Sequence, residues 1–154
     1  MPYNSDKVRQ RTHLGCYEIE CFDVPHNGTP CRAFLIRVDG TTILYCTDFE
    51  YIPYKLDRQN INVMLIEMNY QKDRIDDSNH LSHVVLGHAE EQTTIGVIEC
   101  NMSHLRTVIL CHTSMSGGLN RDLAMKHIRE VVPEYIDVRW AIKGETYNLN
   151  EVPF

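Results

Sequence analysis

Residues 31–47 have the sequence CRAFLIRVDGTTILYCT, which carries the strongest secondary-structure signal in the chain. Two runs rich in β-branched and other apolar residues flank the dipeptide Asp39-Gly40. Asp-Gly is favoured in the two-residue turns that join antiparallel strands, because both turn positions need a positive φ. The segment therefore predicts a β-hairpin.

The chain around this hairpin predicts further strands and a helix. Residues 16–24 (CYEIECFDV) alternate loosely, as a half-buried strand does. Residues 62–68 (NVMLIEM) and 105–112 (LRTVILCH) are continuous apolar runs, which are typical of strands buried on both faces. An amphipathic helix is expected within residues 116–133, with Asn120 as its cap and Pro133 as its stop. The end of the chain predicts two short strands, at IDVRWA (136–141) and ETYNL (145–149).

Another helix is expected in HAEEQTTIGVIECN, residues 88–101. Acidic residues occupy its first turn, where the helix dipole favours them, although Gly96 lowers the helix propensity. One helical face would carry Ala89, Thr93, Val97 and Cys100. Residues 69–83 are polar without periodicity and predict an exposed loop. The order of elements favours an α/β fold, in which helices cover a mixed sheet.

Length and charge limit the class of protein. The chain has 154 residues, enough for one domain, which we expect over residues 15–154 behind a polar arm at residues 1–14. Apolar residues make up 43% and charged residues 23%, a globular composition. The formal net charge of -6 excludes non-specific binding to a phosphate backbone. A nucleic-acid substrate would have to be held locally, for instance by metal ions.

The N-terminal sequence and the cysteine pattern favour a protein of a reducing compartment. The chain has no run of about 18 apolar residues and no apolar leader after Met1, so neither a membrane span nor a secretory signal is expected. Its six cysteines form no CxxC pair and fall mostly in apolar stretches. We therefore expect a cytoplasmic protein whose reduced, buried thiols act as small hydrophobic groups.

Polar residues at the ends of the predicted strands carry the candidate chemistry. They are His26, Asp48, His88 and His112. Open α/β sheets usually keep their functional groups at strand ends. Imidazole and carboxylate are ligands that zinc, manganese and iron accept, and a site for two metals needs an anionic group able to bridge them.

The stretch VPHNGTPCRAFLIRVDGTTILYCTDFE, residues 24–50, resembles a pattern of the metallo-β-lactamase superfamily. In that pattern a His, a hairpin and a strand ending in (S/T)-D follow one another with this spacing. The resemblance implies that His26 binds the first metal and that Asp48 bridges both. LRTVILCHTS resembles the last metal motif of the superfamily, which implies that His112 is the terminal ligand of the second metal. The implied cofactors are divalent ions, Zn or Mn, two in number.

Two segments resemble the superfamily branch of RNase Z and the cyclic phosphodiesterases. NVMLIEMNY looks like the strand that ends in a Glu followed by an Asn, here Glu67 and Asn69, which we expect to support the ligands or to be solvated. GHAEEQTT resembles the branch's helix start, whose His contacts the scissile phosphate or protonates the leaving group. The implied catalytic residues are therefore His88 and Asp48. The resemblance covers about residues 16–132.

The superfamily's His-x-His-x-Asp-His motif does not occur in the sequence given. The remaining ligands give each metal two protein ligands, one of them shared, whereas a catalytic zinc normally has three. Three interpretations stay open. Another polypeptide completes the site, or the chain uses His13, His80 or His83 as substitute ligands, also across a dimer interface, or it is a binding module without catalysis.

The superfamily fold packs two βα halves face to face, and this chain resembles the C-terminal half. We therefore expect a partial metallo-β-lactamase-like αββα fold, a mixed sheet with helices packed on one face. Because the bare sheet face would be apolar, we also expect a homodimer or a complementing N-terminal polypeptide. The expected function is hydrolysis of nucleotide or nucleic-acid phosphodiesters, and the alternative is a catalytically inactive ligand- or protein-binding module.

Overall fold

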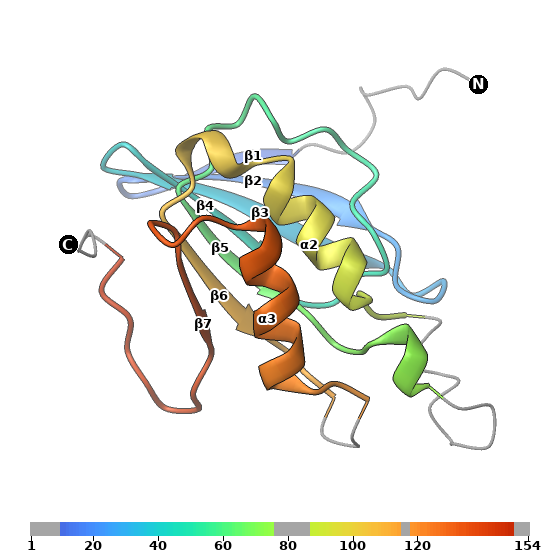
Figure 1. Cartoon of the computed structure of the whole chain (residues 1–154). Coiled ribbons are helices and arrows are strands. Elements are labelled where there is room, and N and C mark those ends of the chain that lie inside the picture. Colours follow the sequence, from blue (N-terminus) through green and yellow to red (C-terminus); the bar gives the residue numbers. More distant parts are fainter. Residues whose placement is uncertain (1–9, 76–86, 115–117, 150–154) are drawn as a thin grey trace.

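The structure, a computed structural model, describes residues 10–75, 87–114 and 118–149. Within these ranges a seven-stranded sheet runs in chain order from β1 to β7 (Figure 1). Its strands are β1 (Gln10–Leu14), β2 (Tyr17–Val24), β3 (Cys31–Val38), β4 (Thr41–Cys46), β5 (Val63–Glu67), β6 (Thr107–Cys111) and β7 (Asp137–Trp140). The helices are α2 (Glu91–Glu99) and α3 (Arg121–Val131), with single turns η1 (Lys72–Arg74) and η2 (Met102–His104).

The sheet is mixed, as the sequence predicts. Strands β1 to β4 pair antiparallel, and β4 to β7 pair parallel. It follows that β2, β4, β5, β6 and β7 all point in one direction. Their carboxyl ends, and the residues that follow them, therefore lie along one edge of the sheet.

The predicted hairpin is confirmed as β3 and β4. Their register pairs Phe34 with Tyr45 and Val38 with Thr41. At the turn, Asp39 and Gly40 have φ values of 48° and 74°. Positive φ at both central positions is the backbone of a type I′ turn, whose twist matches that of the flanking strands.

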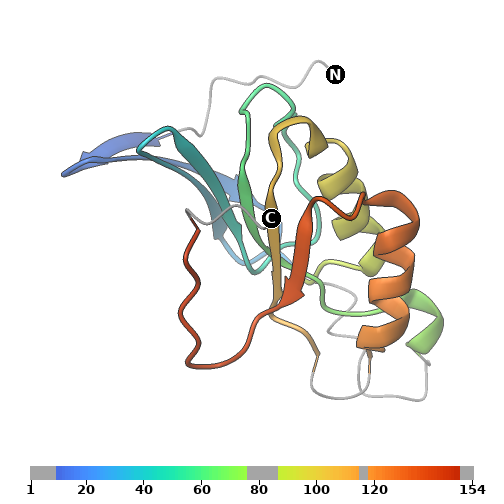
Figure 2. The ribbon, with the colours of Figure 1, turned by 60° about the vertical axis from the view of Figure 1, so that its left-hand side comes forward.

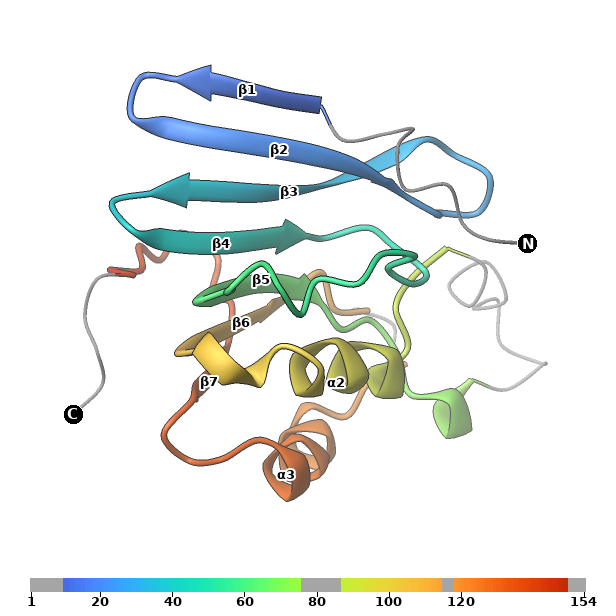
Figure 3. The same ribbon diagram turned by 90° about the horizontal axis from the view of Figure 1, so that it is seen from above.

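Both helices cover the same face of the sheet (Figures 2 and 3). The core lies between them and the inward-facing side chains of the strands. It includes Leu44, Met64, Ile66, Val108 and Leu110 from the sheet and Ile95, Ile98, Ala124 and Ile128 from the helices. Among the described residues, neither helix is long and apolar enough to cross a membrane.

The start and stop signals of α3 are confirmed. Asn120 accepts a hydrogen bond from the backbone N–H of Leu123 at 3.1 Å, and the helix ends two residues before Pro133. In α2, Glu90 is the N-cap and accepts from the backbone N–H of Gln92 at 3.0 Å. The side of α2 that faces the core differs from the face picked out in the sequence, because the buried residues are Glu91, Thr94, Ile95 and Ile98.

Three predictions about the connecting segments are wrong. Residues 10–14, placed in a polar arm, form β1; an edge strand is held by backbone pairing, so its exposed polar side chains give no alternating pattern. ETYNL forms no strand, and instead the Tyr147 hydroxyl accepts from the backbone N–H of Ile142 at 2.8 Å. In the predicted loop after β5, Tyr70 and Gln71 are buried, and residues 76–86 lie outside the described ranges.

All six cysteines are free, and their burial is uneven. Cys46 is buried, and burial raises the pKa of its thiol well above the ordinary value. Burial also raises the pKa of Cys111 to about 12. The prediction of buried thiols is wrong for Cys16 and Cys100, which are exposed.

Candidate metal centre

The four candidate residues meet at the carboxyl edge of the sheet. His26 follows β2 by two residues, Asp48 follows β4 by two, and His112 directly follows β6. His88 comes three residues before α2. Strands β2, β4 and β6 run in the same direction, so their carboxyl ends lie on the same side of the sheet. This brings together segments that are far apart in the sequence.

The distances within this group suit metal binding. One ligand atom each from His26, Asp48 and His88 lie within 4.8 Å of one another. The ring centroids of His26 and His88 are 4.9 Å apart, and those of His88 and His112 are 5.2 Å apart. His112 Nε2 lies 3.5 Å from Asp48 Oδ1. We call His26, Asp48, His88 and His112 the edge cluster.

The donor set of the edge cluster fits zinc or manganese. Ligands about 2.1 Å from a tetrahedral ion are about 3.4 Å from one another, which the Asp48–His112 distance already matches. The remaining separations need shifts of about 1 Å, which side-chain rotation can supply. Imidazoles beside a carboxylate are also the chemistry that zinc accepts.

Glu67, the last residue of β5, supports the edge cluster from inside the protein. Its side chain has no solvent exposure. Oε2 accepts hydrogen bonds from the backbone N–H groups of Phe49 at 3.1 Å and Ala89 at 3.2 Å, and Oε1 accepts from Asn69 Nδ2 at 3.1 Å. These donors compensate the cost of burying a carboxylate.

The same carboxylate orients two imidazoles of the edge cluster. Glu67 Oε1 lies 2.6 Å from His88 Nδ1 and 2.8 Å from His112 Nδ1. An ionised carboxylate only accepts, so both Nδ1 atoms carry a proton, and in the neutral ring Nε2 keeps a lone pair for a ligand. Glu67, His88 and His112 are also close enough to hold an ion themselves. Because Oε1 already accepts from three donors, we assign Glu67 to support.

Sequence reasoning left open whether Glu67 is solvated, and that alternative is wrong. A signal was present, since Glu67 is the one charged residue within the apolar run VMLIEM. Charged side chains are almost never fully buried unless they are paired. A lone carboxylate in a buried strand therefore indicates partners brought from elsewhere in the chain.

Contacts with the backbone hold His26 and His112 in position. His26 Nδ1 donates to the carbonyl oxygen of Gly87, and a Cβ added at Gly87 would lie 3.3 Å from the His26 ring. Glycine thus lets the ring approach the chain closely. His112 has a φ of 52°, an uncommon conformation for this residue type, and Asn69 Nδ2 holds its carbonyl oxygen at 2.8 Å.

Of the substitute ligands proposed from the sequence, His13 lies away from the edge cluster. His13 lies on β1 with its side chain exposed, 3.7 Å from Glu18. From Glu18 the chain runs along β2 for six residues to Val24, about 20 Å, before it approaches His26. His13 is therefore wrong as a ligand within one chain. His80 and His83 lie outside the described residues.

Comparison with known proteins identifies the fold. The sequence matches no protein-family model, and no curated protein is significantly similar to it. Solved structures do match, among them YhfI from Bacillus subtilis, described as a metallo-β-lactamase fold protein, with a TM-score of 0.68 and 20% identity. The chain has a metallo-β-lactamase-like fold. The match covers 88% of this chain and 50% of YhfI.

Two further structures share the metallo-β-lactamase-like fold. Zn²⁺-bound PqqB from Methylobacterium extorquens matches with a TM-score of 0.63 and 12% identity, over 92% of this chain and 54% of PqqB. A diphosphatase from the PhnP family matches with a TM-score of 0.54 and 14% identity, over 84% of this chain and 43% of that one. The chain thus spans about half the length of the solved structures it matches. At 12–20% identity, the similarity to these structures establishes the fold alone.

Proposed function

We propose that this chain is a metal-dependent hydrolase domain that cleaves phosphodiesters of nucleotides or nucleic acids. The observation that carries the proposal is the edge cluster, in which three imidazoles and a carboxylate from four distant segments converge on one space. The hydrogen bonds made by the Nδ1 atoms of His26, His88 and His112, to the Gly87 carbonyl oxygen and to Glu67, hold the three rings in place and leave their Nε2 atoms available as ligands.

His26, Asp48 and His112 would hold the divalent ions, with Asp48 between them. The ions would supply Lewis acidity toward water and a phosphoryl oxygen. His88 would act on the leaving group. With Nδ1–H donated to Glu67, a protonated His88 presents Nε2–H to the edge and can pass that proton to the departing oxygen.

One observation favours a phosphorus substrate, and the net charge of the chain sets a condition on how it would be held. One structural neighbour with the same fold is a diphosphatase. The net charge of -6 gives the chain no general attraction for phosphate, so a phosphodiester would depend on ions held at one place. The edge cluster is such a place.

We also propose that a second polypeptide completes the site. The sheet face opposite the helices is apolar, and its part over β2 to β4 is half-exposed, with Tyr45 40% exposed. The register places on this face Ile19, Cys21, Phe34, Ile36, Ile43, Tyr45 and Leu65. Burying such a surface favours association. Because the matched structures contain about as much chain again, the expected occupant is a complementing βα polypeptide, with a second copy of this chain as the other outcome.

Metal analysis and a hydrolysis assay test the proposal together. Protein purified without a chelator, together with the polypeptide that completes the site, should bind about two equivalents of Zn or Mn and hydrolyse bis(p-nitrophenyl) phosphate. Asp48→Ala should abolish both properties. His104→Ala is the matched control, since His104 is an exposed imidazole on η2.

The molar mass in solution, measured by light scattering, identifies the occupant of the bare sheet face. A dimer would indicate a second copy of this chain. If neither the chain nor its complex with a captured partner bound metal or hydrolysed the diester, the hydrolase proposal would fail. The inactive binding module would then be the correct interpretation.

A further inference from the structure

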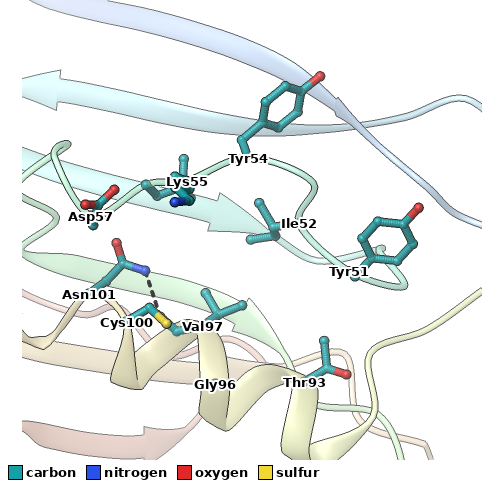
Figure 4. Close-up of a pocket in the computed structure, with 11 residues that line it drawn as sticks. Tyr51, Ile52, Tyr54, Lys55, Asp57, Thr93, Gly96, Val97, Cys100 and Asn101 are labelled. Atoms are coloured by element: carbon teal, nitrogen blue, oxygen red, sulfur yellow. Dashed lines mark hydrogen bonds between the residues drawn. The ribbon is translucent and has the colours of Figure 1, made fainter. Parts of the chain in front are cut away.

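A cavity of about 550 Å³ lies between α2 and the loop from β4 to β5 (Figure 4). Its volume is within the range of about 300–1,000 Å³ found for small-molecule pockets. None of the edge-cluster residues lines it. The lining residues used below are Tyr51, Tyr54, Lys55, Asp57, Gly96 and Cys100.

The helix wall of this pocket contains a glycine that the fold does not require. Gly96 lies in the middle of α2, where glycine is a poorer helix former than any residue except proline. A Cβ added at Gly96 meets nothing within 4 Å. Packing therefore does not exclude a side chain there. The missing side chain leaves this part of the helix open toward the pocket.

The opposite wall is aromatic and anchored. Tyr54 packs edge-on against the buried Phe22, with ring centroids 5.3 Å apart and an interplanar angle of 76°. Tyr51 lies toward the other end of the pocket, on the same side (Figure 4). Together with Ile52, these tyrosines give the loop side of the pocket an aromatic and aliphatic lining, which favours a planar ring over a bulky or branched ligand.

The charged groups of the pocket lie at one end, away from Tyr51 and Thr93 (Figure 4). Lys55 and Asp57 lie near each other, beyond the aromatic section (Figure 4). An ammonium group donates hydrogen bonds and a carboxylate accepts them. Together they suit a ring edge that carries both an acceptor and a donor, as the edges of nucleobases do.

We propose that this pocket binds a planar nitrogen heterocycle of nucleobase size. The end near Tyr51 is the one closest to the edge cluster, because Tyr51 follows Asp48 by three residues, about 10 Å of extended chain. A nucleotide could thus place its base in the pocket and a phosphate at the edge cluster. That connection rests on the proposed function, whereas binding of the ring alone does not.

Equilibrium dialysis with adenosine, which has no phosphate, tests the pocket on metal-free full-length protein. Adenosine should bind saturably, and the aliphatic probe octanoate should not compete. Bound adenosine should also slow alkylation of Cys100 several-fold and leave Cys16 unchanged, since both thiols are exposed and only Cys100 lines the pocket.

The variants Gly96→Leu and Gly96→Ala separate pocket filling from helix effects. Leu fills the cavity and should weaken adenosine binding by about tenfold or more, while Ala should change it by less than about threefold. Both should unfold at the wild-type temperature or above it, because both are better helix formers than glycine. A Gly96→Leu variant that binds adenosine like wild type, no adenosine binding, or equal competition by octanoate would each overturn the proposal. Hydrolysis of bis(p-nitrophenyl) phosphate is a separate measurement, so either proposal can fail alone.

Discussion

Replacing Glu67 with Gln tests whether this carboxylate is the internal support of the edge cluster. The two carboxylate oxygens accept five hydrogen bonds, three at Oε1 and two at Oε2. A Gln side chain puts an NH₂ group in one of the two positions. At least two buried donors then lose their acceptor and face another donor.

The magnitude follows from that count. A hydrogen bond to a charged group contributes about 1.5–3 kcal/mol, so the loss of two should lower the free energy of unfolding by about 3–6 kcal/mol. For a chain of this size the melting temperature should fall by about 10 °C or more.

Asp48→Asn is the matched control for the Glu67→Gln variant. Its carboxylate is 36% exposed and accepts a hydrogen bond from Thr47 Oγ1 at 3.1 Å. The Asp48→Asn substitution should lower the free energy of unfolding by less than about 1 kcal/mol while abolishing metal binding. Urea unfolding in the presence of a chelator measures both variants without any contribution from bound metal. If Glu67→Gln cost under 1 kcal/mol, or Asp48→Asn cost as much, the assignment of support and ligand roles would be refuted.

Three further predictions concern the surroundings of the edge cluster and the helices. Gly87→Ala should weaken zinc affinity by about tenfold, because its Cβ displaces the His26 ring, and calorimetric titration showing unchanged affinity would contradict this. In metal-free protein, the thiols of Cys46 and Cys111 have a raised pKa in the folded state, so stability is unaffected below pH 9. As pH rises above about 9, each thiol should lower the free energy of unfolding by up to about 1.4 kcal/mol per pH unit. A free energy of unfolding that stays constant between pH 9 and 11, measured by chemical unfolding, would count against this prediction. Asn120→Ala removes the cap of α3 and should lower the free energy of unfolding by about 1 kcal/mol, and a change under about 0.3 kcal/mol in urea unfolding would argue against the cap.

The sequence predicted the elements whose signals are local. Asp39-Gly40 specifies its turn through backbone conformation alone, and Asn120 needs only a backbone N–H three residues away. The convergence of the edge cluster also followed from the order of strands. These predictions held because each depends on neighbours in the chain or on strand direction.

Features that depend on distant partners could not be predicted. The role of Glu67 requires the N–H groups of Phe49 and Ala89, each about 20 residues away. The sequence picked out a face of α2 that includes Val97, yet Ile95 and Ile98 face the core. Both faces carry apolar residues, so periodicity alone does not identify the one that meets the sheet.

We propose that the edge cluster holds metal through side chains that Glu67 orients. Anomalous scattering from a crystal of the zinc-loaded protein, measured across the zinc absorption edge, locates the ion. We expect an anomalous peak about 2.0–2.2 Å from Asp48 and from Nε2 of His26 or His112. A peak elsewhere on the protein, or zinc ligated through the Nδ1 atoms that donate to Glu67, would contradict it.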